Sequence, residues 1–235
     1  LWRTMGLYKA QFISMIIMIS LGIGIFIGFN MEWVSIEKNT GGFFDDTGFA
    51  DYRIVSEAGF TKNDIKSIED MDGVDRASRY VCVNADVKGR DGDSVALTVT
   101  ENELAPGDAY DSEGADGIWL SDRYAGANNI AAGDKLTLEY KNFEIKGEVK
   151  GLIKASEHMV CVRDETQIMP DYDNYGYAYI SPVFYEKAAG FEYYPQINVI
   201  SDMSKKAFTD EADDALDRTL LILSKDENMS YAGAD

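Results

Sequence analysis

The chain has 235 residues, of which 46% are hydrophobic, and 41 acidic against 22 basic side chains give a net charge of −19. This length and composition suit a folded protein with a sizeable core. Arg3 and Lys9 are the only charged residues before Glu32, so every acidic group lies at or beyond Glu32. Because binding to a phosphate backbone needs a basic surface, the composition argues against nucleic acid as a partner.

The first predicted element is an uncharged run of eighteen residues from Phe12 to Phe29. As a helix at about 1.5 Å per residue it would be roughly 27 Å long, close to the hydrocarbon core of a bilayer. Its glycines, in SLGIGIFIGF, are spaced GxGxxxG and not as the GxGxxG of a nucleotide-binding loop. No small-x-small cleavage site of a signal peptide follows the run. Residues 1–30 are therefore predicted to hold a short N-terminus and a transmembrane helix.

The charges on either side of this helix predict its orientation. Arg3 and Lys9 precede it, and Glu32 is the first charge after it. The positive-inside rule then places the N-terminus in the cytoplasm and residues 31–235 outside the cell membrane, with lipid around the helix.

Small residues recur every four positions along the same helix, at Ser20, Gly24 and Gly28. Such a stripe lets a second helix approach closely, which predicts a helix-packing face. Glycine is also common in membrane helices that have no such face, so both interpretations stay open.

After a connector at residues 31–50, the sequence predicts a strand, a helix and two further strands. Thr61-Lys-Asn-Asp64 is a capping box that opens the helix, and Gly73 follows its end. Runs of alternating and β-branched apolar residues surround it. The expected elements are a strand at 51–56, a helix at 61–71 and strands at 74–87 and 94–100.

The middle of the chain differs from the preceding part in its predicted elements and its composition. A short helix at 121–128 and a turn at Gly133-Asp134 precede two alternating strands, 135–140 and 143–153. The following part is rich in tyrosine, which favours either an exposed docking surface or, more simply, packing between two subdomains. These tyrosines are Tyr172, Tyr175, Tyr177, Tyr179, Tyr185, Tyr193 and Tyr194.

Near the other end the strand-helix-strand pattern returns, with a strand at 196–201, a helix at 204–216 and a strand at 219–224. The predicted fold class is α+β: one N-terminal transmembrane helix, then an extracytoplasmic domain of two βαβ-type units interrupted by a β-rich inserted subdomain. Residues 51–104 and 191–235 are expected to form the outer α+β part, and residues 105–190 the insertion.

The residues offer little for catalysis. His158 is the only histidine and no GxSxG motif is present, so a Ser-His-Asp catalytic triad is not expected. Cys82 and Cys161 lie in strand-like runs and suit either a disulfide or two buried thiols. If HMVCVRD is a strand, His158 and Cys161 point to opposite faces and form no dyad. No GxxxxGK[ST] occurs either, so energy from ATP would have to come from a partner.

Three acidic clusters could in principle attract calcium, but none completes an EF-hand loop. Ordinary acidic turns explain them more simply. We therefore predict no catalytic residue, no cofactor and no metal ligand. The clusters are Asp70-Met-Asp72-Gly-Val-Asp75, Asp91-Gly-Asp93 and Asp171-Tyr-Asp173-Asn174.

Three stretches, in this order, carry a resemblance to a known family: RTMGLYKAQFISMIIMISLGIGIFIGF, FADYRIVSEAGFTKNDIKSIEDMDGVDRASRY and IWLSDRYAGANNIAAGDKLTLEYKNFEIKGEVKGLI. Together they resemble the N-terminal part of an FtsX-like ABC transporter permease with a MacB-like periplasmic core domain. The resemblance implies a porter-like subdomain, residues 51–104 and 191–235, interrupted by a sabre-like insertion, residues 105–190. It also implies further membrane helices beyond residue 235, where SKDENMSYAGAD is similar to the stretch before a second one.

The resemblance further implies a role without catalysis, in which a cytoplasmic ATPase moves the membrane helices and bends the external domain. The implied partners are a cytoplasmic ABC ATP-binding subunit, a second permease copy or paralogue, and an extracellular protein or peptide cargo. The coupling helix of such permeases is not found in this sequence. The alternative function is a single-span, membrane-anchored sensor or ligand-binding ectodomain.

Overall fold

The computed structural model of the chain describes residues 8–101, 110–114, 116–164, 166–201 and 233–234. The chain divides into two compact units, Leu1–Gly42 and Phe43–Asp235. The helix and strand of the second pattern repeat, expected at 204–216 and 219–224, lie outside the described residues.

Helix α2 has 38 residues, from Lys9 to Asp46; it forms the described part of the first unit, and its last four residues belong to the second. It is long and apolar enough to span a membrane, and its apolar side chains are exposed along its length. The predicted apolar helix is therefore found, but it continues through most of the segment expected to be a connector, residues 31–50. No proline interrupts residues 30–46, so nothing in this stretch breaks the backbone hydrogen-bond pattern.

The second unit is built on one sheet of nine strands in the order β3-β7-β4-β6-β5-β2-β8-β1-β9. Since β2 also pairs with β3, six of these strands form a closed ring of hydrogen-bonded neighbours. The strands are β1 (Tyr52–Val55), β2 (Val74–Val87), β3 (Ser94–Thr100), β4 (Ile118–Ser121), β5 (Lys135–Tyr140), β6 (Phe143–Ile153), β7 (Tyr175–Ile180), β8 (Gln196–Ser201) and β9 (Gly233–Ala234). The helices are α3 (Lys62–Glu69), α4 (Asp122–Ala127), α5 (Pro182–Ala189) and the 3-10 turn η1 (Ser156–His158).

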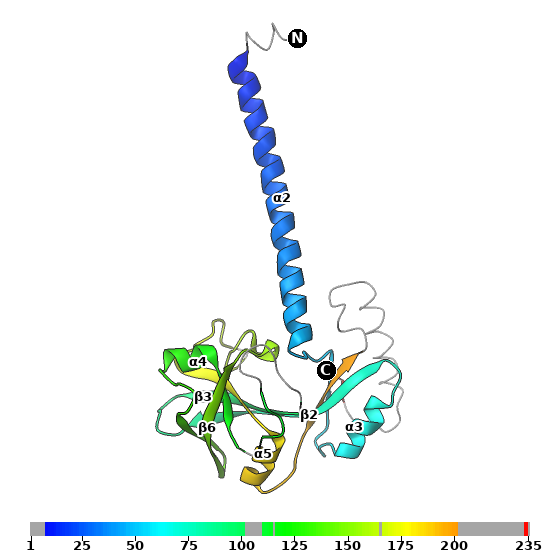
Figure 1. The fold of residues 1–235 in the computed structure, drawn as a ribbon, viewed down its shortest axis with the longest axis vertical. Coiled ribbons are helices and arrows are strands. Elements are labelled where there is room, and N and C mark those ends of the chain that lie inside the picture. The colour runs from blue at the N-terminus through cyan, green and yellow to red at the C-terminus, as the bar shows by residue number, and fades with distance from the viewer. Residues whose placement is uncertain (1–7, 102–109, 115, 165, 202–232, 235) are drawn as a thin grey trace. The chain divides into compact units, whose positions relative to one another are not determined.

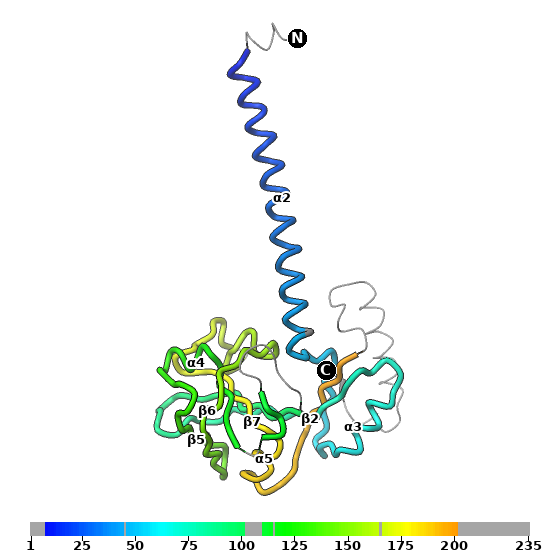
Figure 2. Tube along the Cα trace, in the orientation of Figure 1, coloured from blue at the N-terminus to red at the C-terminus, as the bar shows by residue number. Residues whose placement is uncertain are grey.

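The long strand β2 belongs to both parts of this sheet. Residues 74–80 pair with β8, and residues 80–86 pair with β3 in the ring. Figure 1 shows β2 crossing the unit from the ring, near α4 and β6, to the side where α3 packs, and the tube in Figure 2 follows the same path. One strand thus links the ring to the β2-β8-β1 layer.

The β2-β8-β1 layer has its own small core. β8 lies between β1 and β2 and is antiparallel to both, so β1 and β2 run parallel in a split β-α-β unit. Helix α3 covers one face, with Ile65 and Ile68 packed on Ile54 and Val199. The predicted capping box is present, because Asp64 Oδ2 accepts hydrogen bonds from Thr61 N at 2.6 Å and from Thr61 Oγ1 at 2.8 Å.

The ring holds the larger core. Its inward side chains include Val81, Leu97, Leu120, Leu138 and Ile145, each at most 6% exposed. β7 was not predicted as a strand, because all six of its residues are buried and its sequence YGYAYI shows no polar alternation. α5 was also missed, although Ser181 caps it, Pro182 occupies its first turn and Gly190 closes it with φ 77°.

The tyrosine-rich part packs inside and not on the surface. Tyr175, Tyr177 and Tyr179 on β7 are buried, as are Tyr185 and Tyr194, whereas Tyr193 is 40% exposed. Their rings meet edge to face, for example Tyr177 and Tyr179 with centroids 6.1 Å apart. Burial of these five side chains contradicts an exposed docking surface, while their position between two subdomains stays a prediction.

The prediction of a strand over HMVCVRD is wrong. The stretch begins in η1 and continues as a loop, so the alternation of strand faces does not apply to His158 and Cys161. Successive polar side chains of η1 point into the fold, whereas successive side chains of a strand point to opposite faces. Cys82 and Cys161 are both free thiols.

Candidate functional site

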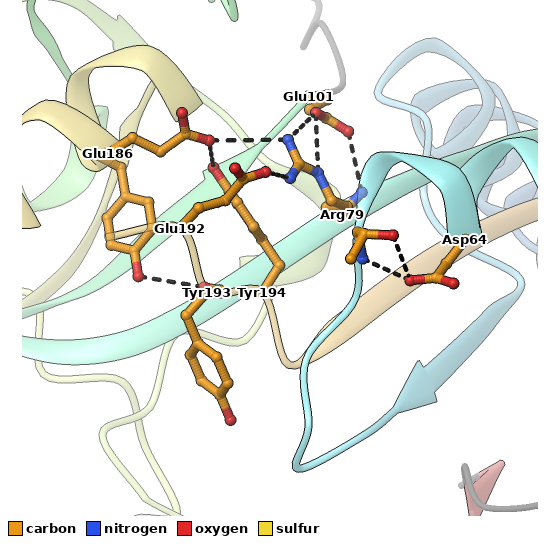
Figure 3. A network of polar contacts seen from close by, with 9 residues as sticks. Asp64, Arg79, Glu101, Glu186, Glu192, Tyr193 and Tyr194 are labelled. Carbon is orange, nitrogen blue, oxygen red and sulfur yellow. Dashed lines mark hydrogen bonds and ion pairs between the residues drawn. The ribbon is translucent and has the colours of Figure 1, made fainter. Parts of the chain in front are cut away.

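The feature that best ties the two parts of the sheet together is a buried arginine. Arg79 lies on β2 with its side chain 1% exposed. Its Nη2 and Nε atoms lie 2.8 and 3.2 Å from Glu101 Oε1, and Nη1 donates to Glu192 (Figure 3). The guanidinium also lies 4.2 Å from the ring centroid of Tyr194. Glu186 Oε1 is 3.9 Å from Nη2 and accepts a hydrogen bond from the Tyr194 hydroxyl.

We call Arg79, Glu101, Glu186, Glu192 and Tyr194 the Arg79 cluster. Burial acts to lower the pKa of Arg79, but the hydrogen bonds that its guanidinium donates to Glu101 and Glu192 outweigh this effect, and the pKa is raised. The cluster joins β2, the residue after β3, helix α5 and the segment before β8. Because its carboxylates are paired with the guanidinium of Arg79 or accept the Tyr194 hydroxyl, the cluster acts as a clamp between elements.

The segment 191–195 presents alternate residues to two sides. Glu192 and Tyr194 face Arg79, whereas in Figure 3 the ring of Tyr193 points away from it. The backbone is held by hydrogen bonds from Ser56 N to Pro195 O and from Phe60 N to Tyr194 O, both 2.8 Å. The segment is therefore fixed on one side by the Arg79 cluster and on another by the loop between β1 and α3.

The side of this segment that faces away from Arg79 lines a pocket of about 420 Å³. This volume lies within the range of small-molecule sites. β2, β3, the turn between β5 and β6, α5 and the segment 191–195 form its walls. We call it the aromatic pocket; it is lined by Val81, Cys82, Val83, Leu97, Val99, Tyr140, Lys141, Asn142, Phe143, Tyr185, Phe191, Tyr193 and Pro195.

The only histidine of the sequence is half-buried between a threonine and a tyrosine. His158 Nε2 lies 3.1 Å from Thr98 Oγ1, and its ring stacks on Tyr177 at 4.8 Å. Burial lowers the pKa of His158 to about 4. Burial also raises the pKa of Cys161 to about 11, so neither group is prepared for nucleophilic catalysis.

Next to this histidine in the sequence, the carboxylate of Glu157 is hydrogen-bonded to residues of the sheet. It accepts hydrogen bonds from Asn198 Nδ2 at 2.7 Å and from the Tyr179 hydroxyl at 3.3 Å, and Arg53 lies 3.9 Å away. Burial is the largest influence and raises the pKa of Glu157. These partners hold η1 against β7 and β8.

Residues 47–51 connect α2 to β1, and Thr47 and Asp51 in this connection are hydrogen-bonded to other elements of the second unit. Thr47 is 1% exposed, and its Oγ1 lies 2.7 Å from Phe43 O and 2.6 Å from Ser156 Oγ. Four residues later, Asp51 N donates to Val199 O at 2.9 Å, and Asp51 Oδ2 accepts from Ser201 N at 2.7 Å. Thr47 and Asp51, which follow α2, are thus bonded to η1 and β8 within this unit.

The predicted helix-packing residues Ser20, Gly24 and Gly28 lie on the exposed surface of α2. No atom comes within 4 Å of a Cβ built at either glycine. The stripe is open, and its role in helix packing stays a prediction.

The acidic clusters behave as turns. Asp171 Oδ2 accepts from Asn174 Nδ2 at 3.0 Å, and Asp93 accepts from the buried Tyr124 hydroxyl at 2.8 Å. Across the described ranges, no group of three or more His, Cys, Asp or Glu residues could hold a metal ion.

The Arg79 cluster and the aromatic pocket were both missed from the sequence. One signal was available: Arg79 interrupts an otherwise β-rich run, RASRYVCV, at a position where the strand is buried. A charge at such a position requires a partner. Its carboxylates, however, lie 22 to 113 residues further along the chain and could not be identified from spacing.

The sequence matches no protein family and no curated protein. In structure, the chain is similar to the extracellular domain of the noncanonic ABC-type transporter YknZ from Gram-positive bacteria, with a TM-score of 0.43 and 13% identity over 73% of this chain and 94% of that one. It is also similar to the periplasmic region of MacB from Actinobacillus actinomycetemcomitans, with a TM-score of 0.40 and 12% identity over 82% of this chain and 91% of that one. A MacB periplasmic region is thus among the neighbours, as the sequence resemblance implies.

Proposed function

We propose that this chain is the extracytoplasmic domain and first membrane helix of an ABC transporter permease subunit, which transmits conformational change from a cytoplasmic ATPase to the cell exterior. The observation that carries the proposal is the continuity of α2, which runs from the apolar stretch to Asp46 without a break. A flexible linker would absorb a movement of the membrane helix, whereas a continuous helix passes it on.

The connection after the helix supports the same role. Thr47 is buried and bonded to Ser156, and Asp51 is bonded to β8, so the residues that follow α2 are tied to two elements of the second unit. A tilt or rotation of the last turn of α2 would act directly on η1 and β8. From β8 it would reach β2, whose far half belongs to the ring.

The proposed topology follows from charge. The N-terminus, with Arg3 and Lys9, lies in the cytoplasm, and residues 31–235 lie outside the membrane. In this proposal the β2-β8-β1 layer with α3 is the centre of the porter-like subdomain, and the ring contains the sabre-like insertion. The stripe at Ser20, Gly24 and Gly28 packs against another membrane helix of the complex.

A first experiment tests the complex. The chain, tagged and expressed from its own locus, is purified from membranes in mild detergent and assayed for vanadate-sensitive ATP hydrolysis. We expect activity to copurify, and Gly24→Leu to reduce it at least fivefold because a bulky side chain blocks helix approach. Phe26→Leu, on the opposite face of the helix, serves as the matched control and should leave it unchanged. A chain that brings down no ATPase would support the single-span sensor instead.

A second experiment tests transmission. In the purified complex, ATP with vanadate should change the protease-cleavage pattern of the external domain. Inserting Gly-Gly-Ser after Glu37 breaks α2 and should abolish this change while the ATPase still copurifies. An unaltered nucleotide response in the insertion variant would refute transmission through the helix.

A further inference from the structure

We propose that the aromatic pocket is a binding site for a small amphiphilic anion, a molecule with an apolar or aromatic body and one negatively charged group. This inference goes beyond the transporter role and does not depend on it. It rests on the lining of the pocket, on the charge at its rim and on the way in which the wall formed by Phe191 and Tyr193 is fixed.

The walls of the pocket are suited to an apolar body. Val81, Leu97 and Val99 form a buried aliphatic floor on β2 and β3. Phe143 and Phe191 also line the pocket, with ring centroids 6.4 Å apart and nearly perpendicular planes, and they contact the lining rings of Tyr140 and Tyr185, so the wall is an edge-to-face aromatic cluster that suits a further ring. The volume of about 420 Å³ would hold a bicyclic aromatic group or a short alkyl chain.

The rim of the pocket carries one cation without an acidic partner. Lys141 is the only charged residue among those that line it. The two nearest acidic residues along the chain are already paired, Glu139 with Lys88 at 2.6 Å and Glu144 with Lys146 at 2.5 Å. Across the described residues no carboxylate forms an ion pair with Lys141, and its Nζ lies 5.1 Å from the ring of Tyr140. A ligand anion would supply the missing partner.

The net negative charge of the protein does not rule this out. At physiological ionic strength the Debye length is about 8 Å, so distant surface carboxylates are largely screened at the rim. The local cation and the apolar surface beside it then determine which ligand is preferred.

The wall formed by Phe191 and Tyr193 is held in position before any ligand arrives. Glu192 and Tyr194, which alternate with them, are bound to Arg79. The Tyr193 hydroxyl also donates to Glu57 O at 3.1 Å. A preformed wall avoids the entropy cost of ordering two aromatic side chains on binding.

The test uses the full chain in phosphatidylcholine nanodiscs, with empty nanodiscs as the blank. Isothermal titration calorimetry compares naphthalene-2-sulfonate with naphthalen-2-ylmethylammonium, which have the same ring system and opposite charges. We expect one saturable site for the sulfonate and at least fivefold weaker binding of the ammonium compound. No saturable binding of the sulfonate, or equal binding of both compounds, would overturn the proposal.

Variants locate the site. Lys141 has φ 51°, a conformation that asparagine tolerates well, so Lys141→Asn removes the cation without straining the turn. It should bring the two ligands within twofold of each other, whereas Lys135→Asn, an exposed lysine outside the pocket, should change neither. Val83→Phe should weaken sulfonate binding at least fivefold by filling the pocket. Unaltered binding in both pocket variants would place the site elsewhere and overturn the assignment.

The fixed wall has its own test. Glu192→Gln weakens the hold of Arg79 on the segment without changing the residues that line the pocket. We expect sulfonate affinity to fall at least threefold, with a thermal unfolding scan to confirm that the variant is folded. An unchanged affinity would overturn the claim that the Arg79 cluster preorganises the pocket.

Discussion

Replacing Arg79 by glutamine tests whether the Arg79 cluster holds the two parts of the sheet together. Glutamine keeps a donor and much of the side-chain length but removes the charge and the planar fork. Arg79→Gln leaves Glu101, Glu186 and Glu192 close together without a cation. We expect the free energy of unfolding to fall by about 3 kcal/mol.

This magnitude follows from the contacts. Hydrogen bonds to a charged group contribute about 1.5–3 kcal/mol each when shielded from solvent. Glu101 and Glu192 are 32% and 51% exposed, so about 1 kcal/mol for each is appropriate. The buried guanidinium over Tyr194 adds about 1–2 kcal/mol. The carboxylates can be rehydrated once the arginine is gone, which keeps the loss below the upper limit for a broken buried ion pair.

The assay is urea unfolding of the full chain in nanodiscs, followed by tryptophan emission. Trp119 is 5% exposed on β4 and packs edge to face on Tyr110, so its emission reports the folded ring. Trp2→Phe and Trp33→Phe remove the other two tryptophans. Arg79→Lys should lose about 1–2 kcal/mol, since it keeps the charge but not the two-nitrogen contact to Glu101.

The matched control is Arg123→Gln, at an exposed arginine 5.5 Å from the ring of Tyr172. It should change the unfolding free energy by less than about 0.5 kcal/mol. If Arg79→Gln were no more destabilising than Arg123→Gln, the interpretation of the Arg79 cluster as a clamp would be refuted.

Three further predictions concern packing and pH. Gly176→Ala should destabilise the folded protein by about 3 kcal/mol or prevent folding, because the new Cβ would lie 2.4 Å from Tyr124 Cβ. The control Gly126→Ala, in open space on α4, should be neutral or stabilise the protein by up to about 1 kcal/mol, and thermal unfolding compares the two variants. His158 has a lowered pKa, so the unfolded chain takes up its proton first as pH falls below about 6.5, and about 2 kcal/mol of stability should be lost by about pH 5; His158→Gln should remove this part of the pH dependence in urea titrations. Glu157 has a raised pKa, so the folded chain takes up its proton first and gains stability on acidification; Glu157→Gln should abolish that gain, and an unchanged pH profile would contradict the buried position of its carboxyl.

Local patterns in the sequence predict much of this fold. The strands at 74–87, 94–100, 135–140 and 143–153 have the predicted bounds, because each alternates or is rich in β-branched residues and ends at a glycine or polar turn. The capping box at Thr61 is equally local. These features depend on neighbours within a few residues, and the sequence displays those directly.

The remainder depends on contacts between distant parts of the chain. The ring closes through the parallel pairing of β3 with β7, about 80 residues apart, and no local pattern specifies that partner. β7 was missed because it is buried on both faces. The Arg79 cluster was missed because its acidic residues come from three separate elements. The strand predicted over HMVCVRD is absent because the stretch begins in η1 and continues as a loop, in which Met159 and Val160 are 50% and 67% exposed.

The alternation in the segment 191–195 also limits how its sequence can change. Side chains of an extended backbone repeat every two residues. Inserting or deleting one residue here would exchange the two sides, sending a glutamate into the aromatic pocket and a phenylalanine toward Arg79. Inserting two residues would restore the original parity. Among related chains, length changes between α5 and β8 should therefore come in even numbers.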